Sequence, residues 1–154
     1  MNYAGFWRWR PKSSARPAIV LTAVRLGIPV FGVCLGLQGI VEAFGGELGV
    51  LDYPMHGKRS VVRNRGVGIF QGLPEEFQVG RYHSLYAKPA TFPACLEATA
   101  ESTEGGIIMA VRHRELPIEA VQFHPESILT LTPGANYGLK LIENAVKLGK
   151  MAKV

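Results

Sequence analysis

The pattern of apolar and polar positions predicts a helix, a buried strand and a second helix in the first third of the chain. Pro17 in a first turn and Gly27 as a stop signal bound the first helix. Residues 28–33 (IPVFGV) form a continuous apolar run with branched side chains, which is typical of a buried strand. Residues 37–44 predict the second helix, which ends at a Gly-Gly pair. This order indicates an α/β fold built in layers.

The rest of the chain predicts short strands followed by one helix. Turn signals such as DYP at 52–54 and EGG at 104–106 separate six predicted strands, which cover residues 47–53, 58–64, 77–87, 96–102, 107–113 and 118–123. A helix is predicted over residues 135–148, with one apolar face made by Leu139, Ile142, Ala145 and Val146. The chain has no internal repeat or low-complexity tract, so we expect one compact domain.

Cys34 lies where the buried strand gives way to the second helix. The stretch Gly32-Val33-Cys34-Leu35-Gly36 matches the G-x-S-x-G nucleophile elbow, with sulfur in place of oxygen. Glycines on both sides avoid collisions in the sharp turn, which lifts the sulfur clear of the sheet. The N-terminus of the helix favours the thiolate, and the N–H of Leu35 is placed to stabilise an oxyanion. On the pentapeptide alone, a buried structural cysteine is the alternative.

A catalytic thiol needs a base, and His124 is the strongest candidate among the four histidines. It follows the apolar strand of residues 118–123, and open α/β sheets place their active sites at the carboxyl ends of strands. Glu126 lies two residues later, so in an extended chain its side chain shares a face with His124 and can fix the tautomer of the ring. Cys34, His124 and Glu126 therefore form a candidate triad.

A zinc site is the rival explanation for a cysteine and a histidine in one chain. Zinc-dependent deaminases combine H-x-E with P-C-x-x-C, but this sequence has no C-x-x-C, and Cys34 precedes His124 by 90 residues. The sequence has no H-x-x-x-H either. We therefore expect neither a metal nor another cofactor.

The basic excess of the chain lies at its start. The net charge is +5, yet five of the 17 basic residues and none of the 12 acidic residues precede Glu42, so the remainder balances. An Arg- and Trp-rich arm suits contact with nucleic acid, but no nucleic-acid-binding motif follows it, so we do not expect such a partner. Two cysteines give no disulfide framework, and we see neither a signal peptide nor a bilayer-length apolar stretch. These features predict a cytoplasmic protein.

Four motifs resemble those of the class I, triad-type glutamine amidotransferases. They are GVCLGLQ at 32–38, PMHGK at 54–58, GRYHSL at 80–85 and AVQFHPES at 120–127. The first and last mark the class, and the middle two favour the glutaminase component or domain of anthranilate synthase over the GMP and carbamoyl phosphate branches. The similarity covers about residues 17–148. It implies an open, mostly parallel, flavodoxin-like sheet with flanking helices and a small antiparallel sheet.

The resemblance also implies a reaction. Cys34 would attack the side-chain amide of glutamine, His124 would move the protons, and Glu126 would orient His124. Gln38, Ser84 and Leu85 match positions that hold glutamine, the last two largely through their backbone. The ammonia would pass to a synthase subunit or domain that aminates chorismate, in tryptophan biosynthesis.

Other histidines and the second cysteine receive smaller roles. His56 matches a segment near the synthase partner, which indicates a structural or interfacial role. His83 is a less favoured alternative base. His113 and Cys95 are expected to be ordinary sheet or surface residues.

The start of the chain departs from the family pattern. Members of the family carry several tens of residues more before the elbow, including an S-P-G-P-G loop that supplies a second oxyanion donor, and this sequence holds no such loop. We therefore expect an atypical, disordered leader at residues 1–16 and an N-terminally truncated amidotransferase domain at 17–150 that lacks its first strands. Two alternatives stay open: a para-aminobenzoate synthase component, and a catalytically impaired remnant.

Overall fold

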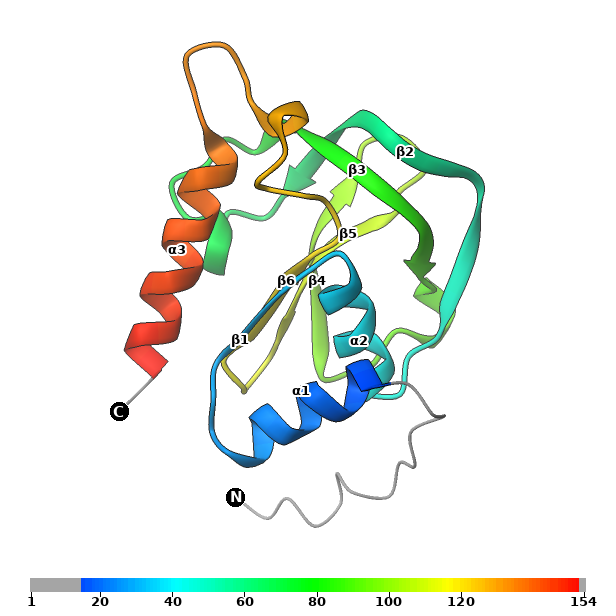
Figure 1. The fold of residues 1–154 in the computed structure, drawn as a ribbon, viewed down its shortest axis with the longest axis vertical. Coiled ribbons are helices and arrows are strands. Elements are labelled where there is room, and N and C mark those ends of the chain that lie inside the picture. Colours follow the sequence, from blue (N-terminus) through cyan, green and yellow to red (C-terminus); the bar gives the residue numbers. More distant parts are fainter. Residues whose placement is uncertain (1–14, 153–154) are drawn as a thin grey trace.

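The structure, a computed structural model, describes residues 15–152 as a layer of strands with helices on both faces (Figure 1). The helices are α1 (Ala15–Arg25), α2 (Leu35–Ala43) and α3 (Tyr137–Ala152). The strands are β1 (Val30–Val33), β2 (Leu48–Asn64), β3 (Glu76–Ala87), β4 (Leu96–Ser102), β5 (Ile108–His113) and β6 (Ile118–Val121). Short 3₁₀ turns lie at η2 (Gly68–Phe70), η3 (Pro89–Thr91) and η4 (Ile128–Thr130).

The described strands form one mixed sheet in the order β1-β6-β5-β4-β2-β3. Only β1 and β6 pair in parallel, and the other neighbours are antiparallel. The α/β class is confirmed, but the expected division into a mostly parallel sheet and a separate antiparallel sheet is not what residues 15–152 show. The two regions are continuous because the end of β2, residues 62–64, pairs with β4 while nearly all of β2 pairs with β3.

Most predicted elements lie where the pattern put them. The two strands predicted at 47–53 and 58–64 are one long strand, β2, whose pairing with β3 is interrupted at the DYP turn signal. The last helix begins two residues later than predicted and continues to Ala152. The predicted leader at 1–16 lies outside the described residues except for Ala15 and Arg16, which begin α1, so its boundary stays a prediction.

Side chains of the central strands alternate between two cores. Ile118 and Ala120 of β6 pack with Leu37 and Ile40 of α2 on one face of the sheet. Val121 belongs to the core on the α3 face, with the core residues Phe70, Phe123 and Leu141. Burial on both faces explains why these strands were recognisable as almost continuous apolar runs.

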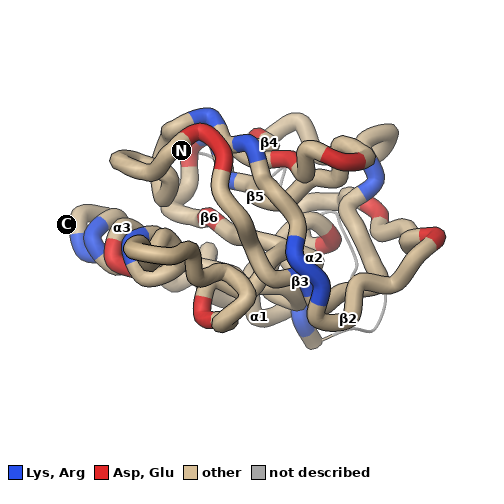
Figure 2. The backbone as a smooth tube through the Cα atoms, turned by 90° about the horizontal axis from the view of Figure 1, so that it is seen from above, with Lys and Arg blue, Asp and Glu red and all other residues tan. Residues whose placement is uncertain are grey.

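The charges of the described chain are nearly balanced. Four of the 17 basic residues and none of the 12 acidic ones lie outside residues 15–152. Figure 2 shows the two signs interspersed over the backbone rather than gathered on one face. None of the helices in this range combines the length and the apolar character that crossing a membrane requires.

The parallel pair β1–β6 brings distant parts of the sequence to one edge of the sheet. Val33 is in register with Val121, and the backbone N–H of Cys34 donates to the carbonyl of Val121 at 2.8 Å. Beyond β6, His124 forms an isolated bridge with Gly80 of β3. The elbow, the segment after β6 and the middle of β3 therefore meet in one place.

Asn144 fixes α3 to the rest of the domain. Its buried amide donates to the carbonyls of Ile69 and Gln71, both at 2.8 Å. These two bonds tie the helix to the segment that follows β2.

We predict that Asn144→Ala lowers the free energy of unfolding by about 2 kcal/mol, because the carbonyls of Ile69 and Gln71 lose the amide that donates to them. Lys147→Ala, at an exposed position of the same helix, serves as control and should stay within about 0.5 kcal/mol of the parent. Equal urea midpoints for the two variants would contradict this account.

Candidate active site

Cys34 occupies a strained turn between β1 and α2. Its φ of 53° makes it the only non-glycine residue with positive φ among residues 15–152. For an L-residue this backbone conformation costs on the order of 1–3 kcal/mol, and surrounding structure must hold it. Part of that structure is Gly32, where a Cβ would come within 2.8 Å of the Gly36 carbonyl carbon and 3.1 Å of the Ala120 Cβ. The steric reason expected for Gly32 is therefore confirmed.

Gly36 does not share that reason. A Cβ built on Gly36 meets no described atom within 4 Å, so the expected collision on this side of the turn is wrong for residues 15–152. Leu35 beside it is exposed, which leaves the first turn of α2 open. The elbow is sterically closed on its strand side only.

The Cys34 thiol is buried and has three polar neighbours. Its sulfur donates to the carbonyl of Tyr82 at 3.8 Å and accepts from the Gln122 side chain at 3.6 Å, and the Leu35 N–H also bonds to it. Burial raises the pKa of Cys34 above its ordinary value, although the Leu35 and Gln122 donors lower it and Glu126 adds repulsion. The direction is opposite to the expected shift toward thiolate, because burial outweighs the Leu35 and Gln122 donors.

His124 and Glu126 interact as expected, and Glu126 is near enough to act electrostatically on the Cys34 thiol. Glu126 Oε1 accepts from His124 Nδ1 at 2.5 Å, which leaves Nε2 of the neutral ring as its basic nitrogen. The His124 ring meets the edge of the Tyr82 ring at 5.1 Å between centroids and 84° between planes. Tyr82 thus contacts Cys34 through its carbonyl oxygen and His124 through its ring. It therefore links two members of the candidate triad.

Two glutamines form a buried amide chain that ends at the sulfur. Gln38 donates to the carbonyl oxygen of Gln122 at 3.4 Å, and Gln122 in turn reaches Cys34. Arg16 of α1 donates to Gln38 at 3.4 Å from the other end. Sequence reasoning found Gln38 but missed Gln122 and Arg16. An uncharged polar residue inside an apolar strand run, as in AVQFH, was the available signal for Gln122.

The remaining predicted site residues are distributed along the β2–β3 ribbon. Ser84 and Leu85 are half-buried on β3, two and three residues after Tyr82, whose carbonyl contacts Cys34. His56 is exposed on β2, in register with Tyr82. His113 is buried at the end of β5 and accepts two backbone N–H bonds, while Cys95 is a half-buried free thiol.

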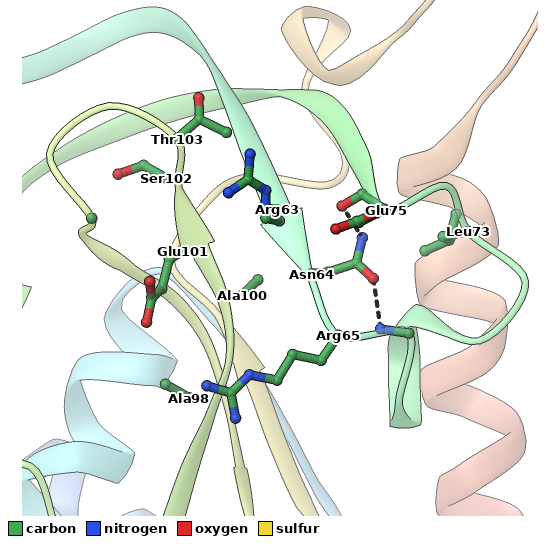
Figure 3. A pocket seen from close by; sticks show the side chains of 12 residues that line it. Arg63, Asn64, Arg65, Leu73, Glu75, Ala98, Ala100, Glu101, Ser102 and Thr103 are labelled. Carbon is green, nitrogen blue, oxygen red and sulfur yellow. Dashed lines mark hydrogen bonds between the residues drawn. The ribbon is translucent and has the colours of Figure 1, made fainter.

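An open groove lies elsewhere on the described surface (Figure 3). This open groove of about 700 Å³ runs along the junction of β2 and β4. Its arginines are paired with acids, Arg63 with Glu76 and Arg65 with Glu97, and its Asn64 side chain bonds to backbone groups. Residues 15–152 hold no group of three His, Cys, Asp or Glu side chains able to bind a metal.

The sequence matches one family model over most of its length. The model is that of class I glutamine amidotransferases, and it aligns with residues 10–143. This chain belongs to the class I glutamine amidotransferase family. The elbow at Cys34 and the His124–Glu126 pair lie inside the matched region.

Similar proteins span different lengths. The chain is 55% identical over 137 residues to an anthranilate synthase of Azospirillum brasilense, covering 89% of this chain and 18% of that protein. It is 48% identical over 120 residues to the aminodeoxychorismate/anthranilate synthase component 2 of Bacillus subtilis, covering 78% and 59%. A solved structure assigned as a GMP synthase subunit of Thermoplasma acidophilum superposes with a TM-score of 0.75 at 26% identity, covering 88% and 64%. The chain therefore spans less than two thirds of each.

The two elbow glycines offer a matched pair of substitutions. Gly32→Ala should lower the free energy of unfolding by about 1–3 kcal/mol, because the new methyl group overlaps backbone. Gly36→Ala should leave it unchanged or raise it by up to about 1 kcal/mol, because the site is open and alanine favours the helix. Urea unfolding measures both, and equal losses would contradict the one-sided elbow.

The amide of Gln122 should hold down the pKa of the thiol. In a Cys95→Ser background, Gln122→Leu removes the donor at 3.6 Å and should raise the pKa of Cys34 further. The pH profile of iodoacetamide alkylation of Cys34 reports this shift. Gln71→Leu, remote from the elbow, is the control and should leave the profile in place. A profile moved to lower pH by Gln122→Leu would refute the assignment.

Proposed function

We propose that this chain hydrolyses glutamine to glutamate and ammonia through Cys34, His124 and Glu126. The observation that carries the proposal is the meeting, at one sheet edge, of an elbow thiol with a carboxylate-bound histidine in a chain of the amidotransferase family. Each group has the partner that its role requires. The thiol has an N–H at hand for the oxyanion, and the base has an acid on its far nitrogen.

The chemistry follows from these positions. Cys34 Sγ attacks the amide carbon of glutamine while His124 Nε2 takes the thiol proton, and the Leu35 N–H stabilises the oxyanion. His124 returns that proton to the departing nitrogen, which leaves as ammonia, and a glutamyl thioester remains. Water, deprotonated by His124, then attacks the thioester carbon, and glutamate leaves as the thiol is restored.

The raised pKa of Cys34 assigns His124 an essential proton transfer. A thiol protonated at rest is a poor nucleophile, so the proton must leave as the carbon–sulfur bond forms. Glu126 supports this step by stabilising the imidazolium. The same carboxylate disfavours a resting thiolate, so it favours coupled transfer over a preformed ion.

We further propose that Gln38 and the Ser84–Leu85 backbone hold glutamine, and that ammonia passes to a chorismate-aminating synthase. The names of the Azospirillum and Bacillus relatives support a partner of this class. The anthranilate branch of tryptophan biosynthesis is favoured, and the Bacillus name keeps para-aminobenzoate synthesis as the alternative. Two free cysteines support a cytoplasmic location.

Substitution of Cys34 and of His124 tests the proposal. Glutamate release should fall below detection in Cys34→Ser, and it should fall at least about 100-fold in His124→Ala, since each loses a group that makes or moves a bond. Cys95→Ser changes a half-buried thiol remote from the site and should keep full activity. Glutamate release that survives Cys34→Ser would refute the proposed function.

A further inference from the structure

Arg81 and His83 form a buried polar pair beside the site. They lie two residues apart on β3, share one face, and are each only 4% exposed. Arg81 Nε donates to His83 Nε2 at 2.9 Å, and Arg81 Nη1 donates to Ser60 at 3.1 Å. No ion pair within residues 15–152 joins Arg81 to a carboxylate. Glu104 acts on Arg81 only electrostatically, without an ion pair, and burial lowers the pKa of Arg81. A buried cation without a directly paired acid is costly, so its presence points to a specific use.

The pair fixes the tautomer of His83. Because a guanidinium can only donate, His83 Nε2 must accept, and the ring proton resides on Nδ1. Nδ1 lies 2.7 Å from the carbonyl of Leu85 and therefore donates to it. Burial, together with the charges of Arg81 and His124, lowers the pKa of His83 to about 4. The neutral ring links Arg81 to the backbone of Leu85.

This link spans a gap in the β2–β3 ladder. Val50 is in register with Leu85 and Met55 with His83, so four residues of β2 stand opposite Ser84 alone. Ser84 has no partner in that register, and the ladder does not fix its backbone. The chain of bonds from Arg81 through His83 to Leu85 passes across this unpaired position. The neighbouring Tyr82 carbonyl is the one that contacts the Cys34 sulfur.

We propose that Arg81 and His83 are positioning residues that hold the Ser84–Leu85 backbone in the form that binds glutamine. This inference rests on the proposed glutaminase function. Neither side chain needs to touch substrate. Their effect should fall on glutamine binding and not on the reactivity of the thiol.

Steady-state kinetics with a matched control test the pair. His83→Phe keeps an aromatic ring but removes both of its hydrogen bonds, and it should raise KM for glutamine about tenfold with kcat within threefold, as expected when the Leu85 carbonyl loses its buried donor. His83→Gln, which can accept and donate at similar reach, should recover most of the loss. His113→Phe replaces an equally buried histidine on β5 and should leave KM unchanged.

Imidazole ¹⁵N NMR and alkylation complete the test. His83 should show the Nδ1–H tautomer and stay neutral from pH 8 to below pH 5, and Arg81→Met should abolish that signature. Iodoacetamide should alkylate Cys34 at the same rate in parent and His83→Phe. An Nε2–H tautomer, an equal KM change in His113→Phe, or an unchanged KM in His83→Phe would overturn the inference. A parent chain that keeps the signature but hydrolyses no glutamine would instead refute the proposed function, and this inference with it.

Discussion

The parallel pairing of β1 with β6 is the contact on which the site depends. Cys34 and His124 are 90 residues apart in sequence, and each follows its strand at the same edge because Val33 and Val121 are in register. The bond from the Cys34 N–H to the Val121 carbonyl extends the pairing by one residue and anchors the strained turn. A slip of one residue would reverse the faces of β1 and change where the sulfur lies relative to His124.

The second wall of the site comes from β3, which lies at the other end of the sheet order. The sheet curls far enough that Gly80 of β3 bridges His124, directly after β6. Gly80 permits this approach, because a Cβ there would lie 2.8 Å from Leu129 and 2.9 Å from the Ser127 hydroxyl. β1 and β3 lie at opposite ends of the strand order, and the curvature of the sheet brings both of them to the site.

Most of the site residues predicted from the sequence were identified from short local motifs. The elbow and the H-P-E segment are short motifs whose geometry is set within a few residues, so Cys34, His124 and Glu126 could be named without a structure. Gln122, Arg16 and the shared role of Tyr82 could not, because each depends on contacts across the fold. The expected shift toward thiolate was wrong for the same reason: the start of a helix is visible in the sequence, whereas the burial that raises the pKa of Cys34 arises from tertiary packing.

The amide chain beside Cys34 determines which end of the Gln122 side chain faces the thiol. Gln122 carries the same functional group as free glutamine and lies against the sulfur, yet it presents its nitrogen. Its carbonyl oxygen accepts from Gln38, which in turn accepts from Arg16 of α1. A series of hydrogen bonds that begins on the first helix therefore orients the amide that meets the sulfur.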